Sequence, residues 1–182
     1  CLDLETGKPS WNYTAGAPIR IAPCVADARV YFGADDGVAY CLDADTGEEI
    51  WRFNAAPDPN LFLNNGRAIS FWPIRTGVLV DEGTAFFGCG MFPWNEAYLY
   101  ALDANDGSLQ FRKDLGSGLT LEGAMLASSD HLLIPQGRIA PKLFDRKTGE
   151  HAGALKGGGG SFVVLLEDGT ALHGPGNKKP SI

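Results

Sequence analysis

A short motif recurs four times along the chain, and this repetition constrains the fold more than any other feature of the sequence. The best copy is Leu42-Asp43-Ala44-Asp45-Thr46-Gly47, followed by Trp51. The turn glycines of successive copies are 40, 60 and 42 residues apart, so the chain is built from similar units. The positions that repeat are Asp3, Gly7, Trp11, Asp43, Gly47, Trp51, Asp103, Gly107, Phe111, Asp145 and Gly149.

A second repeat supports the same period. Residues 78–88 match residues 164–174, an offset of 86 residues, which is two units of 43. Within each unit, segments such as 29–33 and 38–43 predict strands joined by an Asp-Gly turn. In the Asp-x-x-Thr-Gly turns, Asp and Thr oxygens can accept backbone hydrogen bonds while Gly adopts a positive φ. Four short strands in roughly 43 residues indicate an all-β fold made of β-propeller blades.

The pattern Tyr-x-Leu-Asp-x-x-Thr-Gly-x-x-x-Trp, clearest in Tyr40 to Trp51, resembles the repeat of pyrroloquinoline-quinone-like (PQQ-like) β-propellers. The resemblance implies four-stranded antiparallel blades, as in WD40-like propellers, and complete rings of seven or eight. Members of this family include quinoprotein dehydrogenases and the non-catalytic scaffold lipoprotein of the machinery that assembles outer-membrane β-barrels. The resemblance also implies export, to the periplasm or cell envelope.

At this blade length, 182 residues supply about four blades, which we expect to form one partial propeller. Cys1-Leu2-Asp3 matches Cys41-Leu42-Asp43, so we expect the chain to begin inside a blade, as a truncated product would. Exposed blade faces would favour association, so either two copies complete an eight-blade ring or a missing half closes the ring in cis. The expected divisions are a blade remnant at 1–18, blades at 19–56, 57–116 (with an insertion) and 117–156, and a partial blade at 157–182.

The charge of the chain and its hydrophobic pattern argue against a nucleic-acid partner and against a membrane-spanning helix. Fifteen Lys and Arg residues against 22 Asp and Glu residues give a formal charge of −7, which repels the phosphate backbone of nucleic acids. No run of apolar residues reaches the roughly 18 that a membrane-spanning helix needs. We therefore expect neither a nucleic-acid partner nor a transmembrane segment.

The wide spacing between Gly47 and Gly107 predicts an insertion, chiefly at residues 57–73 with a second extension at 89–96. A polar cluster with Arg and Trp there could bind an anionic or flat ligand, or a protein or polysaccharide partner. The alternative is structural: Asn-Gly forms a turn, the Trp fills the core and an Arg caps strand ends. The candidate binding residues are Asn65, Arg67, Ser70, Trp72 and Arg75.

The sequence predicts no catalytic residue, metal site or cofactor. It has no Ser-hydrolase or zinc-protease motif, and the repeated Asp residues are explained by turns. The family resemblance implies PQQ held with calcium by Glu, Asn and Asp, but no such trio can be matched here, and no two cysteines are adjacent. The favoured function is a non-enzymatic scaffold or binding module of the cell envelope. The alternative is a fragment of a PQQ- and calcium-dependent dehydrogenase.

Overall fold

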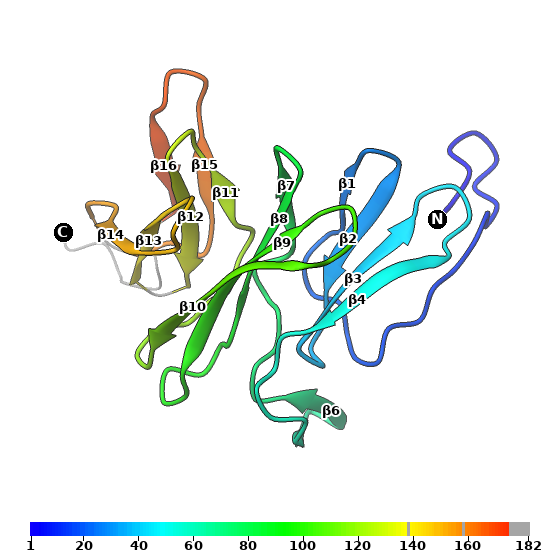
Figure 1. The fold of residues 1–182 in the computed structure, drawn as a ribbon, viewed down its shortest axis with the longest axis horizontal. Coiled ribbons are helices and arrows are strands. Elements are labelled where there is room, and N and C mark those ends of the chain that lie inside the picture. Colours follow the sequence, from blue (N-terminus) through cyan, green and yellow to red (C-terminus); the bar gives the residue numbers. More distant parts are fainter. Residues whose placement is uncertain (138, 158, 175–182) are drawn as a thin grey trace.

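The computed structural model describes residues 1–137, 139–157 and 159–174. Sixteen strands and no helix form in these residues, so the prediction of an all-β fold is confirmed. Three four-stranded sheets lie side by side (Figure 1). In each sheet every strand pairs antiparallel with the next strand along the chain, which is the arrangement of a propeller blade.

The first blade contains β1 (Cys24–Ala26), β2 (Arg29–Gly33), β3 (Val38–Asp43) and β4 (Glu49–Asn54). The second contains β7 (Leu79–Asp81), β8 (Thr84–Cys89), β9 (Ala97–Asp103) and β10 (Leu109–Gly116). The third contains β11 (Leu126–Ala127), β12 (His131–Gln136), β13 (Ile139–Asp145) and β14 (His151–Ala154).

Two hairpins stand outside these sheets. One consists of β5 (Leu61–Asn64) and β6 (Arg67–Ser70), and it lies beyond the ends of the blade strands (Figure 1). The other consists of β15 (Val163–Leu165) and β16 (Ala171–His173), with β15 beside the third blade. Residues 175–182 of the predicted partial blade lie outside the described residues, and the limits of the five divisions stay a prediction.

The Asp-x-x-Thr-Gly segments form the same turn each time. Asp43 Oδ1 accepts hydrogen bonds from the backbone N–H of Thr46 at 2.8 Å and from the Thr46 hydroxyl at 3.0 Å. Gly47 closes this turn with a φ of 74°, which glycine adopts without strain. Asp145 and Thr148 repeat the arrangement at 2.8 and 2.9 Å. The repeated Asp therefore stabilises a turn.

Each blade docks on the next through an aromatic side chain. The indole N–H of Trp11 donates to the Ala44 carbonyl at 2.9 Å, and that of Trp51 donates to the Ala104 carbonyl at 3.0 Å. At the third junction Phe111 lies against Gly149 and has no N–H to donate. The repeat of one aromatic per unit is thus the repeat of one blade junction.

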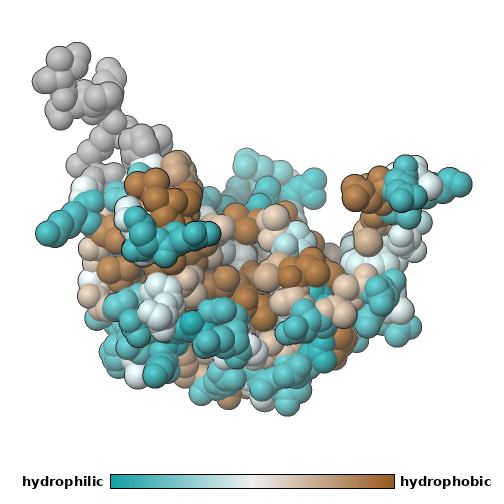
Figure 2. Space-filling model, turned by 90° about the horizontal axis from the view of Figure 1, so that it is seen from above, coloured by the Kyte–Doolittle hydropathy of each residue, from teal (hydrophilic) through white to brown (hydrophobic). Residues whose placement is uncertain are grey.

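The core lies between the blades. Tyr31 and Trp51 of the first blade pack against Phe87 and Tyr100 of the second. Phe86 and Leu99 of the second blade form another cluster with the third. At the far end, apolar side chains gather on the side of the molecule that carries β15 and β16 (Figure 2). Those at least 40% exposed there are Phe162, Val164, Leu166 and Leu172.

Candidate functional site

The insertion between β4 and β7 folds into the β5–β6 hairpin. Its two strands are joined by Asn65-Gly66, whose φ values of 52° and 75° match a two-residue hairpin turn. Phe62 and Asn64 point toward the rest of the molecule and are half-buried, whereas Leu61 and Leu63 are exposed. The alternation of the strand therefore fixes one face on the body and leaves the other in solvent.

Aromatic contacts hold the hairpin against the extended β8–β9 loop. The rings of Phe62 and Phe71 lie 4.6 Å apart, and those of Phe62 and Phe92 lie 5.5 Å apart. Phe92 stacks on Trp94 at 5.1 Å, and Trp94 is 72% exposed. The two segments that the repeat spacing identified as extra, 57–73 and 89–96, thus form one surface.

The five candidate residues do not form one site. Asn65 and Arg75 line the same cavity, whereas Arg67 lines a separate groove. Ser70 is buried, and its hydroxyl accepts the N–H of Trp72 at 3.0 Å. The Trp72 indole donates to the Glu96 carbonyl at 2.9 Å, so it ties the insertion to the β8–β9 loop. Ser70 and Trp72 therefore have structural roles in this arrangement.

The cavity around Asn65 and Arg75 has a volume of about 350 Å³. Its lining is polar: the carboxamides of the hairpin tip face two guanidinium groups and a carboxylate. Apart from Arg75, the residues that line the cavity belong to the hairpin, to the segment before β1 and to the segment before β11. The residues that line it are Arg20, Ile21, Asn64, Asn65, Arg75 and Glu122.

A buried carboxylate fixes both guanidinium groups. Asp35, fully buried, accepts Arg20 Nε at 2.9 Å, Arg75 Nε at 2.8 Å and Arg75 Nη2 at 3.1 Å. Arg75 Nη1 contacts Met91 Sδ at 2.8 Å and lies 3.9 Å from Glu122 Oε1. Arg20 is bonded to Asp35 through Nε, and its side chain is 46% exposed, which leaves its terminal nitrogens available to an anionic or hydroxyl group.

Sequence reasoning missed Arg20, Asp35 and Glu122. Asp35 belongs to an Asp-Asp-Gly turn between β2 and β3, and the motif explains it without any ion pair. Its ion-pair partners are distant in sequence, because Arg20 lies 15 residues before it and Arg75 lies 40 residues after it. No motif in the local sequence predicts these contacts.

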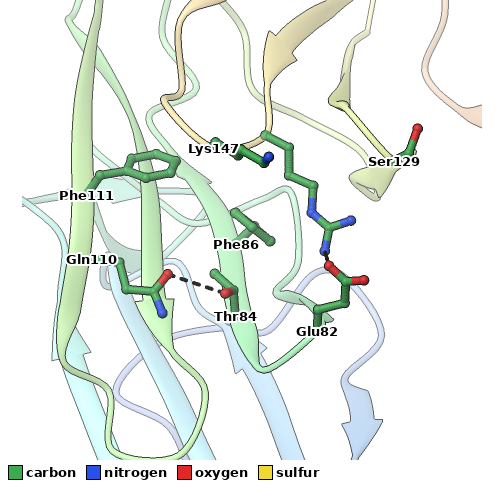
Figure 3. A pocket seen from close by; sticks show the side chains of 8 residues that line it. Glu82, Thr84, Phe86, Gln110, Phe111, Ser129 and Lys147 are labelled. Carbon is green, nitrogen blue, oxygen red and sulfur yellow. Dashed lines mark hydrogen bonds and ion pairs between the residues drawn. The ribbon is translucent and has the colours of Figure 1, made fainter.

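A second cavity, of about 370 Å³, lies at the junction between the second and third blades (Figure 3). Phe86 and Phe111 form its apolar side, and Arg146 donates to Glu82 at 3.0 Å across its opening. At this junction Phe111 stands where the other two junctions have Trp. The Phe111 ring is smaller than an indole and fills less of this junction than a Trp would.

The cysteine beside the insertion, Cys89, has a structural role. Cys89 is buried, and its thiol donates to the Trp72 carbonyl at 3.0 Å. Burial raises the pKa of Cys89 well above its ordinary value, so it is a poor nucleophile. In the described ranges no three His, Cys, Asp or Glu side chains are grouped closely enough to hold a metal ion. No helix in those same ranges has the length and the apolarity that crossing a membrane requires.

Comparison with known proteins agrees with the blade geometry and the turn motif. The family model described as outer membrane protein assembly factor BamB matches residues 1–71 and 35–152. The chain belongs to this family. Within the family's fold, the crystal structure of BamB from Moraxella catarrhalis has a TM-score of 0.63 at 20% identity, over 85% of this chain and 45% of that one. The predicted PQQ-like propeller repeat is therefore confirmed.

Curated relatives of this BamB-family chain include both dehydrogenases and outer-membrane assembly factors. The dehydrogenase subunit of a quinone alcohol dehydrogenase from Gluconobacter oxydans is 31% identical over 61% of the chain. BamB of Escherichia coli is 28% identical over 59% of the chain. The aligned region spans 16% of the first relative and 26% of the second, so either group is compatible with this part of the fold.

The polar cavity does not fit a calcium-bound PQQ site. Asp35 is the carboxylate closest to the polar cavity's guanidinium groups, and both of its oxygens already accept their N–H donors. Glu122 is the one carboxylate lining that cavity, and a calcium ion takes six to eight oxygen ligands.

Proposed function

We propose that the chain is a non-enzymatic binding module of the cell envelope, in which a propeller scaffold presents the insertion to a protein partner. The observation that carries this proposal is the exposed surface of the insertion. Leu63 is 79% exposed and Trp94 is 72% exposed, and both stand on segments fixed to the blades by aromatic contacts. Exposed apolar side chains that are held in place are typical of protein interaction sites.

The arrangement of polar groups supports binding over catalysis. The guanidinium groups of Arg20 and Arg75 are positioned by Asp35, which fixes donors for recognition. The described part of the cavity brings no nucleophile within reach of a general base. Homology to BamB favours a protein partner and the periplasm, and neither a polysaccharide nor a second copy of the chain is favoured by these relatives.

The alternative proposal is a fragment of a quinoprotein dehydrogenase, which the 31% identity to a quinone alcohol dehydrogenase favours. In that case the cofactor ligands would lie partly in this chain and partly in blades outside it. The ligands within this chain would then bind calcium and PQQ weakly but saturably, which a non-enzymatic scaffold would not.

Site-specific photocrosslinking tests the binding proposal. A photoreactive residue is placed at Leu63 or at Trp94, and at the exposed Asp168 in the β15–β16 turn as a control. We expect one defined protein to crosslink from Leu63 and Trp94 in intact cells, and its purified form to bind the purified chain. Equal crosslinking from all three positions, or none from the insertion, would contradict the proposal.

A further inference from the structure

The two outer edges of the β5–β6 hairpin are not paired with another strand, and the register of the hairpin shows which backbone groups point outward along each edge. Asn64 lies opposite Arg67 beside the turn, and Leu63 lies opposite Ala68. In a hairpin with a two-residue turn, the pair beside the turn bonds to itself, and the next pair points its N–H and C=O groups outward. The N–H of Ser70, two residues beyond Ala68, donates outward to the Asp35 carbonyl at 2.7 Å, which confirms this phase.

The outward groups of Ala68 face a groove. This groove has a volume of about 490 Å³ and lies between β6 and the segment 13–19. Among the described residues, nothing is hydrogen-bonded to the Ala68 N–H or carbonyl. The strand thus offers a free donor and a free acceptor at an accessible edge.

The opposite wall of the groove is fixed, and its middle part, between Tyr13 and Pro18, is made of small residues. Thr14, Ala15, Gly16 and Ala17 contribute short side chains, so a second backbone can approach β6 closely. The Pro18 carbonyl accepts the Asp35 N–H at 2.9 Å, which anchors this wall to the same turn that pairs with Ser70. Both walls are therefore held by one buried turn.

The side chains beside the groove indicate what an added strand would carry. Leu61 and Leu63, 53% and 79% exposed, lie on the same face of the hairpin as Ala68 but on β5, one strand further from the groove. They extend the apolar face that alternate residues of an added strand would join. Arg67 is exposed at the groove and would face an acidic side chain. Apolar residues at alternate positions and one acidic residue describe the matching segment.

We propose that the free edge of β6 binds an extended segment of a partner protein, which adds to the hairpin as a third strand. Backbone hydrogen bonds to Ala68 supply the pairing, Arg67 selects an acidic residue, and the leucines of β5 continue the apolar face that the added strand joins. This inference rests on the proposed function as a protein-binding module and names the form in which the partner is recognised.

A defined peptide tests the proposal. The probe is a fluorescein-labelled octapeptide of alternating valine and threonine with one glutamate. The control peptide has the same sequence, but alternate backbone amides are N-methylated. Fluorescence anisotropy measures binding of both peptides to the wild-type chain, Ala68→Pro and Leu63→Pro. The two prolines remove outward N–H groups from the same cross-strand pair, but Ala68 alone faces the groove.

We expect the wild-type chain and Leu63→Pro to bind the unmethylated peptide with similar affinity. Ala68→Pro should bind about tenfold or more weakly, because it loses a backbone donor to the peptide. The methylated peptide should bind all three proteins weakly. Arg67→Glu should weaken binding of the glutamate peptide. It should not weaken binding of a peptide that has lysine in place of the glutamate.

Equal binding by Ala68→Pro and the wild-type chain, undiminished binding of the methylated peptide, or no binding by the wild-type chain would overturn the inference. If Ala68→Pro does not fold, amide hydrogen exchange on the wild-type chain replaces it, and the Ala68 amide must gain protection when the peptide is added. A partner that crosslinks at Leu63 while this amide stays unprotected would leave the proposed function intact and refute strand addition.

Discussion

The indole ring of Trp51 lies directly on Gly107, so closely that a Cβ atom on the glycine would stand 2.8 Å from Trp51 Cδ2. Trp11 lies on Gly47 in the same way, with a corresponding distance of 2.5 Å. Each glycine therefore serves twice, closing a turn at positive φ and giving the preceding blade's aromatic a flat place to dock.

Replacing this glycine tests the blade junction. Gly107→Ala should lower the free energy of unfolding by about 3 kcal/mol, because the methyl group meets the indole and the backbone is strained. Gly83→Ala is the matched control, since Gly83 has a φ of 74° but nothing within 4 Å of its Cβ position. Chemical denaturation should show a loss of about 1–2 kcal/mol for the control, and equal losses would refute the docking role.

Restoring the missing indole tests the third junction. Phe111→Trp should raise the free energy of unfolding by about 0.5–1.5 kcal/mol, because the new N–H can reach the carbonyl of Arg146, which follows Asp145 as Ala104 follows Asp103. The reciprocal variant Trp51→Phe should lose stability by a similar amount or more. A destabilised Phe111→Trp would show that the third junction is built differently.

The buried carboxylate of Asp35 should be important for stability. Asp35→Asn should cost about 3–5 kcal/mol, because two guanidinium groups lose their common partner, and the Arg75 side chain is 13% exposed. The exposed pair of Lys113 and Glu150 offers a comparison, and Glu150→Gln should change stability by less than about 1 kcal/mol. Equal effects in urea denaturation would contradict this account of Asp35.

Acid should weaken the turns of the repeat. Backbone and side-chain hydrogen bonds from Thr46 lower the pKa of Asp43 below its ordinary value, and Thr148 does the same for Asp145. A carboxyl with a lowered folded-state pKa adds stability above its unfolded pKa and loses it as pH falls through the folded pKa. Asp43→Asn should therefore flatten the fall of Tm as the pH drops from 5 to 2, through and below the ordinary carboxyl pKa of 3.8. An unchanged slope would show that this turn does not contribute to acid sensitivity.

The repeat made most of the fold predictable, because each Asp-x-x-Thr-Gly turn and each aromatic after it repeats a local geometry. The spacing between Gly47 and Gly107 also located the insertion. The site was less predictable, since Arg67 and Arg75 look equivalent in sequence but line different cavities. The contacts of Asp35 with Arg20 and Arg75 depend on how the insertion returns to the blades, and no local pattern records that path.

The central claim is that this propeller binds a partner without a quinone cofactor. Titration of the folded chain with PQQ and calcium, followed by thermal melting and by cofactor absorbance, tests it most directly, because a ligand that binds the native state must raise Tm. We predict a cooperative melt whose midpoint does not move and an absorbance that shows no saturation. A saturable rise in Tm with matching absorbance would contradict the account and favour the dehydrogenase.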